Sequence, residues 1–256
     1  MSDAAFVPTF SPRRPAIRAA GLLALPVLFA LAACGGGRGE APEAGENAHA
    51  AAAQSASAVG SAAAASAAPL PPAVEALGHH AENAYDQVRS SNWPAARTAV
   101  DSLKAGLGGL DALPAAEPFT DMIGATVAAL DTAVTRRDRA RALVDANALT
   151  RMEADVARVF HPAVPADVTL LDYYGRELEI WSTAGKLPTL QATATRLRET
   201  WDGLRPQVVA RNGAAEATRF DALLAQVAAA RAPADYARLA TPVLDEVDAL
   251  EKVFTR

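Results

Sequence analysis

The residues of this chain best suited to chemistry are three carboxylates and one histidine near position 80. They are Glu75, His79, Glu82 and Asp86, spaced four, three and four residues apart. A helix places such residues on one stripe, and His79 with Glu82 or Asp86 could share a metal ion, since imidazole and carboxylate are suitable ligands. The stripe lies roughly 150° from the apolar face that begins at Val74, at ~100° per residue. We therefore expect a solvated face with no bound metal or cofactor.

The remaining histidines form no recognisable catalytic set. His80 lies at the flank of the apolar face, where a half-buried packing role is expected. His161 precedes a proline in an expected inter-helix loop, and His49 lies in a low-complexity segment. Neither has a recognisable Ser or Cys nucleophile as a partner, and Gly106–Gly109 closes an expected helix instead of joining a strand to a helix as a phosphate loop does. We predict that the protein is not an enzyme and has no catalytic residue.

Two further groups of residues each allow two interpretations. A clump of arginines between expected helices could dock an acidic partner, although nearby aspartates favour surface ion pairs. A set of aromatic residues could line a ligand groove, although their spacing favours core or helix-end positions. The two groups are Arg136, Arg137, Arg139 and Arg141, and Trp93, Trp181, Trp201, Tyr173 and Tyr174.

Cys34 is the only cysteine, and it ends an apolar run, Ala19–Ala33, that follows three arginines. An apolar segment of about 15 residues matches the core of a secretory signal and is short of the ~20 needed to span a bilayer. If Cys34 is modified, no thiol is left for disulfides, thiolate metal sites or haem attachment.

The segment Leu31-Ala32-Ala33-Cys34 resembles the lipobox of bacterial lipoprotein signal peptides. The resemblance implies a diacylglycerol on the Cys34 thiol, cleavage before Cys34 and acylation of the new amine. Two or three acyl chains would anchor the protein stably. In that class an Asp after the cysteine tends to retain the product in the inner membrane, so Gly35 implies the outer membrane. The alternative is an ordinary signal peptide, or a short membrane anchor, in which Cys34 is incidental.

These features divide the chain into three predicted parts. Residues 1–33 are a removed signal peptide, 34–72 a lipid-attached disordered tether rich in Ala, Gly, Ser and Pro, and 73–256 a helical domain. Loss of the signal peptide removes three Arg and one Asp and takes the net charge from −5 to −7. An acidic protein is a poor nucleic-acid binder and is not attracted to anionic lipids, so we expect membrane attachment through the lipid alone.

Helical periodicity runs from Ala73 to the end of the sequence, and sustained two-residue alternation is absent. The sequence therefore predicts an all-α fold of antiparallel helical bundles with about eight helices. Pro242 is expected to kink or restart the last helix. The expected helices are residues 73–91, 94–110, 117–135, 138–160, 167–184, 188–204, 214–230 and 234–255, read from apolar spacing and from Pro and Gly punctuation.

An offset of 94 residues aligns the two halves of the domain without gaps. Pro94 then falls on Pro188 and Phe160 on Phe254, and several apolar positions also coincide. The sequence thus suggests two duplicated four-helix units, 73–160 and 167–254. The alternative is a chance match between two sets of amphipathic helices.

The segment Gly78-His79-His80-Ala81-Glu82 and the expected pair of bundles resemble imelysin-like periplasmic lipoproteins. Those proteins are built of two four-helix bundles and carry a Gly-x-His-x-x-Glu motif. Glu82 stands one residue too early for that motif, so the resemblance rests on architecture, which does not fix function.

Together the sequence predicts a lipid-anchored envelope lipoprotein that presents a helical bundle on a flexible tether. We expect a non-enzymatic binding or structural role, with the membrane and an envelope protein as partners and no nucleic acid. The alternative is a periplasmic metal- or small-ligand-binding module. That alternative predicts one pocket on which several residues converge, namely His79, His80, Glu82, Tyr173 and Tyr174.

Overall fold

A computed structural model of the protein describes residues 69–256. The predicted signal peptide, the lipobox with Cys34 and the predicted tether up to residue 68 lie outside the described residues. Pro72, which we expected to end the tether, is instead the first residue of a helix. Among the described residues, no helix combines the length and the apolar character needed to cross a bilayer.

The described residues are helical throughout, with short turns between the helices and no strand. The all-α prediction is therefore confirmed. In chain order the elements are α2 (Pro72–Arg89), α3 (Trp93–Asp111), α4 (Glu117–Arg136), α5 (Arg139–Ala157), the 3-10 helix η1 (Arg158–Phe160), α6 (Ala166–Thr183), α7 (Leu187–Ala210), α8 (Ala214–Ala229) and α9 (Pro233–Thr255).

Helices α7 and α9 both continue through an internal proline. Helix α7 runs through Pro206 to Ala210, beyond its expected end at residue 204, and α9 does not restart at Pro242. Both prolines are exposed, while neighbouring residues such as Val208 and Val243 are fully buried. A proline on the solvent side disturbs one turn of backbone hydrogen bonds, and the buried face on either side holds the helix together.

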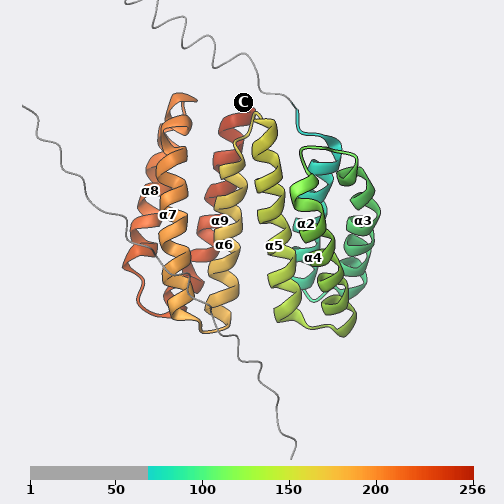
Figure 1. Cartoon of the computed structure of the whole chain (residues 1–256). Helices are drawn as coiled ribbons and strands as arrows, with labels where there is room; N and C mark the ends of the chain where they lie inside the picture. Colours follow the sequence, from blue (N-terminus) through green and yellow to red (C-terminus); the bar gives the residue numbers. More distant parts are fainter. Residues whose placement is uncertain (1–68) are drawn as a thin grey trace, which may run out of the picture. The chain divides into compact units, whose positions relative to one another are not determined.

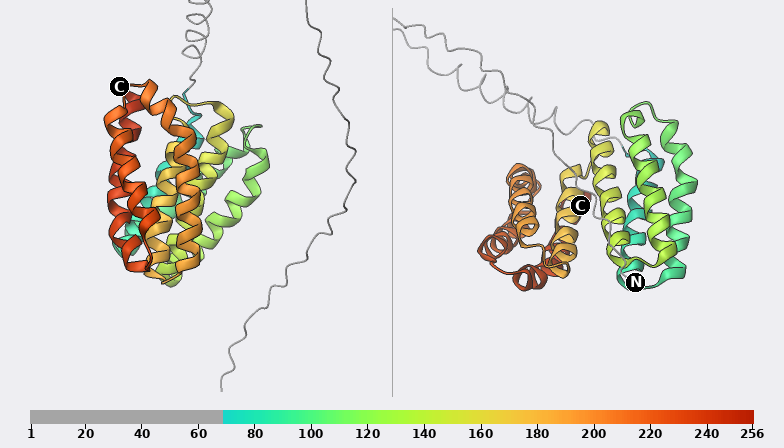
Figure 2. Two further views of the ribbon diagram at one scale, coloured as in Figure 1. Left: turned by 90° about the vertical axis from the view of Figure 1, so that its left-hand side faces the viewer. Right: turned by 60° about the horizontal axis from the view of Figure 1, so that its bottom comes forward.

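The helices form two antiparallel four-helix bundles, α2–α5 and α6–α9 (Figure 1). In the first bundle α2 packs against α3 and α5, and α4 packs against its two chain neighbours; the second bundle repeats this pattern with α6, α7, α8 and α9. Helices α5 and α6 join the bundles and pack against each other. The right-hand view of Figure 2 shows the two bundles side by side, and the left-hand view looks along the direction in which they are stacked.

Each bundle has its own core of large apolar side chains. Tyr85, Ile123 and Leu149 are at most 1 % exposed in the first bundle. In the second bundle Trp201 and Phe220 are fully buried, with ring centroids 4.7 Å apart. Burial of such side chains is the main favourable term in folding.

The two bundles share a register of 94 residues. Helices α6, α7 and α9 begin 94 residues after α2, α3 and α5, respectively. Pro94 and Pro188 both lie in the first turn of their helices. Ser91 and Gly185, in equivalent turns, both have left-handed backbone angles, with φ of 59° and 67°. A duplication would produce this register, and the duplication stays a prediction.

Candidate functional site

A groove of about 900 Å³ runs between the two bundles. Helices α2 and α9 form its walls, and residues of α5 and α6 form its floor. The groove exists because α5 and α6 pack against each other, whereas α2 and α9 are not a closely packed pair.

Acidic side chains dominate the polar lining of the groove. Eight carboxylates face two arginines, Arg89 and Arg176, and one histidine, His79. The eight are Glu75, Glu82 and Asp86 of α2, Glu153 of α5, Asp172 of α6, and Asp245, Asp248 and Glu251 of α9. Like charges in a concave surface create a field that attracts the opposite charge, so the groove favours cations.

Glu153 is the most unusual of these carboxylates. As a residue it is 6 % exposed, none of the hydrogen bonds or ion pairs of the described residues involves its carboxyl group, and its carboxyl oxygens keep contact with the groove. Gly78 of α2 makes room for it, because a Cβ at position 78 would lie 3.1 Å from Glu153 Cγ and 3.3 Å from Cδ. Burial raises the pKa of Glu153 to about 8, and the nearby Glu82 adds to the rise. Glu153 therefore holds a proton at neutral pH.

Asp172 and Arg176 lie one turn apart on α6 and form an ion pair, with Arg176 Nη2 2.9 Å from Asp172 Oδ2. Arg176 is 8 % exposed, donates a hydrogen bond to Thr150 Oγ1 at 3.2 Å, and lies 3.6 Å from Glu82 Oε1. Burial raises the pKa of Asp172 to about 7 despite the attraction of Arg176. Burial also raises the pKa of Glu82.

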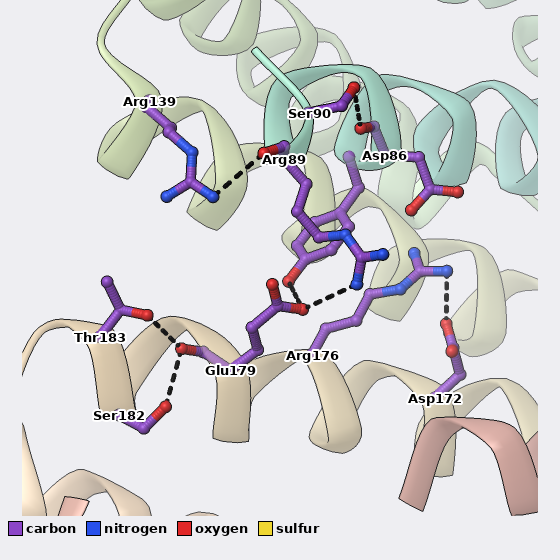
Figure 3. Close-up of polar contacts among 10 residues, drawn as sticks. Asp86, Arg89, Ser90, Arg139, Asp172, Arg176, Glu179, Ser182 and Thr183 are labelled. Carbon is purple, nitrogen blue, oxygen red and sulfur yellow. Dashed lines mark hydrogen bonds and ion pairs between the residues drawn. The ribbon is translucent and has the colours of Figure 1, made fainter. Parts of the chain in front are cut away.

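Further polar contacts connect α2 with α6 next to Arg176 and its acidic neighbours. Tyr85 donates a hydrogen bond to Glu179 Oε2 at 3.1 Å, and Arg89 lies 3.4 Å from the same oxygen. The guanidinium of Arg176 lies 4.9 Å from the centroid of the Tyr85 ring. Figure 3 shows Arg89 of α2 and Arg176 of α6 lying close together, with Glu179 and Asp172 as their acidic partners. These contacts hold the bundles together along the groove.

We expect Tyr85→Phe to lower the free energy of unfolding by about 1 kcal/mol, the typical net value of one hydrogen bond. The ring remains buried, so the loss reports the hydroxyl alone. Chemical denaturation measures the change. A loss below about 0.3 kcal/mol would mean that the Tyr85–Glu179 contact does not stabilise the junction of the bundles.

The four residues that the sequence grouped near position 80 differ in their exposure. Glu75, His79 and Asp86 are exposed, as expected for a solvated stripe, and Glu82 is partly buried. All four line the groove, and the prediction of a plain solvent face is therefore incomplete. His80 is partly buried, as expected for a packing residue, and burial lowers its pKa.

A shared pocket of the five residues named for a metal or small-ligand module is not formed. His79 and Glu82 line the groove, but His80, Tyr173 and Tyr174 do not. Within residues 69–256, no three His, Cys, Asp or Glu side chains are arranged to hold a metal ion. His161 lies in the turn between η1 and α6 with a left-handed backbone angle, φ 48°.

The arginine clump and the aromatic set have structural roles. Arg141 forms an ion pair with Asp145 at 2.7 Å, and Arg139 donates a hydrogen bond to the backbone carbonyl of Arg89. The tryptophans do not line the groove: Trp201 is fully buried, and Trp181 donates a hydrogen bond to Glu177. Gly106–Gly109 lies in the last turns of α3, as expected.

Sequence analysis missed most of the charged groove residues outside the α2 stripe, among them Glu153, Asp172 and Arg176. Glu153 approaches Glu82 because α5 packs against α2, and Asp172 and Arg176 approach it because α6 packs against α5. Carboxyl groups with raised pKa values in a cleft are typical of functional sites.

Comparison of the chain with protein-family models, with curated proteins and with solved structures finds no match.

Proposed function

We propose that this chain is a lipid-anchored binding protein of the bacterial envelope that takes a cationic ligand into the groove between its two bundles. The observation that carries the proposal is Glu153, a side chain only 6 % exposed that has no ion-pair partner among the described residues and lies in a groove lined by seven further carboxylates. Desolvation and the neighbouring Glu82 disfavour the charged form of this carboxyl group. A cationic ligand bound beside it would offset both effects.

The anchor places this groove at a membrane surface. Lipidation of Cys34 would attach the mature chain to the outer membrane on its periplasmic side, and residues 35–68 would give the domain reach. We propose a binding role for this groove because it offers an extended charged surface on both of its walls.

Native mass spectrometry of the full-length lipoprotein, purified from its own membranes in detergent, tests the proposed function. We expect a small cationic adduct on the wild-type protein and its loss from the double variant Glu82→Gln, Glu153→Gln. Glu199→Gln, which changes an exposed carboxylate outside the groove, is the matched control. The same adduct on the wild-type protein and on the double variant would contradict the proposal. The absence of any adduct in every sample would also contradict it.

Cys34→Ser tests the anchor separately. We expect this variant to lose incorporation of labelled palmitate and to leave the membrane fraction, because one serine hydroxyl cannot receive the thioether-linked lipid. Fractionation and metabolic labelling measure the change. Unchanged labelling would show that Cys34 is not the lipidated residue.

A further inference from the structure

We infer that the ligand of this groove is a linear alkyl polyamine, with one ammonium group seated against Glu153. The inference rests on the proposed function and specifies the chemistry of its ligand. A ligand of this kind requires three features of the groove: an elongated acidic surface, apolar side chains along it, and a hydrogen-bond acceptor fixed deep inside it.

The acidic surface is elongated along both walls. On α2 the carboxylates run from Glu75 to Asp86, which is roughly 16 Å at 1.5 Å per residue. On α9, Asp245, Asp248 and Glu251 follow at three-residue steps, roughly 4.5 Å apart. Charges spread in this way match several cationic centres along a chain better than one compact ion.

Apolar side chains line the same groove as these carboxylates. The lining includes Leu70, Val164, Val168, Leu244 and Val247. The methylene segments of an alkyl polyamine would cover this apolar surface, as the stems of lysine side chains do on protein surfaces. A metal ion or a hydrated inorganic cation would leave it exposed.

Glu153 supplies the acceptor at depth. None of the hydrogen bonds or ion pairs of the described residues involves its carboxyl group, and the absent side chain of Gly78 leaves this group reachable from the groove. A primary ammonium has three donors, which can be shared between Glu153 and Glu82 of the facing helix. The ammonium then takes the place of the proton that Glu153 holds in the empty groove, so binding at neutral pH releases a proton.

Arg176 limits what else the groove accepts. It already neutralises Asp172 and part of Glu82, with distances of 2.9 and 3.6 Å. Arg176 repels any cation beside it, and it repels a divalent metal ion about twice as strongly as a single ammonium group at the same distance. The carboxyl groups that Arg176 does not neutralise are those of α9, Glu153, and Glu75 and Asp86 of α2. These groups are again spread along the groove.

Isothermal titration of the full-length lipoprotein in detergent with spermidine, a linear triamine, tests the inference. We expect saturable binding at pH 7 and a roughly 10- to 100-fold loss of affinity in Glu153→Gln, the typical effect of losing a charge-assisted hydrogen bond. Glu199→Gln should bind as the wild type does. Buffers of different ionisation heat should reveal proton release in the wild type and none in Glu153→Gln.

Gly78→Ala provides a second variant that keeps every charge. Its Cβ would crowd Glu153 at 3.1 Å, so we expect weaker spermidine binding with the fold retained. Equal affinity in wild type, Glu153→Gln and Gly78→Ala would overturn the inference.

Parallel titrations with calcium, zinc and trilysine separate the inference from the proposed function. Binding of trilysine or a metal that depends on Glu153, without binding of spermidine, would overturn the polyamine inference and leave the proposed function standing. No binding by any probe, together with no adduct in the mass spectra, would overturn both.

Discussion

Arg176→Gln is expected to lower the free energy of unfolding by about 3–5 kcal/mol at pH 8, the usual cost of removing one partner of a buried ion pair. Arg176 is 8 % exposed and is the cation nearest to Asp172 and Glu82. Without it, Asp172 is left as a buried carboxylate whose neighbours are also acidic. The substitution also removes the hydrogen bond that Arg176 donates to Thr150 of α5.

The cost of Arg176→Gln should depend on pH. Asp172 has a raised pKa of about 7 even beside Arg176, and removing the arginine raises it further. At pH 5 Asp172 is therefore protonated in the folded variant, and the buried negative charge is absent. We expect the loss at pH 5 to be about half of the loss at pH 8 or less.

Urea denaturation at both pH values measures these losses. Arg198→Gln is the control, because Arg198 forms an exposed ion pair with Asp202 on α7 and such pairs contribute about 0.2–1 kcal/mol. If Arg176→Gln lowers the free energy of unfolding no more than Arg198→Gln does, the contacts of Arg176 with Glu82 and Thr150 do not hold the bundles together.

Glu153→Gln is expected to change the pH dependence of stability. The pKa of Glu153 is raised from 4.5 to about 8 in the folded protein, so between these values the folded state holds a proton that the unfolded state has lost. Stability from this group is thus fully present below pH 4.5 and is lost as the pH rises toward 8. Asp172, raised from 3.8 to about 7, contributes with the same sign.

Glutamine keeps the shape of the side chain and cannot ionise. We expect the fall in unfolding free energy between pH 5 and pH 8 to shrink by about 2–4 kcal/mol in Glu153→Gln, with the remainder due to Asp172. Denaturant titrations across this range give the slope, and Glu199→Gln should leave it unchanged. Identical slopes in wild type and Glu153→Gln would mean that Glu153 is ionised in the folded protein.

The helices could be predicted from the sequence because each one carries a one-sided apolar pattern and clear end signals. Asn92 and Asp138, for example, accept backbone hydrogen bonds at the starts of α3 and α5. The expected end of α7 at residue 204 was too early, and the restart expected as one possibility at Pro242 does not occur, because burial on both sides of an exposed proline outweighs the lost hydrogen bond.

One wall of the groove corresponds to a stripe that the sequence reveals, although we expected that stripe to face solvent, and the other charged lining residues could not be predicted. The stripe of Glu75, His79, Glu82 and Asp86 is local to one helix, and periodicity reveals it. Glu153 is at a position where the apolar face of α5 continues through Leu149 and Val156, and a carboxyl on that face was an overlooked signal. Its approach to Gly78 depends on how α5 packs against α2, which helical periodicity does not specify.

The groove itself results from how the two bundles pack. Each bundle is determined largely by its own apolar pattern, but the junction of α2 with α6 is made of polar contacts such as Tyr85 with Glu179. Polar residues on a helix surface are equally consistent with solvent exposure, so no pattern in the sequence marks them as a junction.

The central claim is that a cation binds at Glu153, and carboxyl-detected NMR tests it most directly. The full-length protein, with glutamate carboxyls labelled with ¹³C, is titrated with spermidine at pH 7, and the Glu153 signal is assigned from its absence in Glu153→Gln. We expect a saturating shift of the Glu153 signal from the protonated toward the ionised position, while the Glu199 signal does not move. If the Glu153 signal stays in place while the signals of exposed carboxyl groups shift without saturation, no cation binds at Glu153.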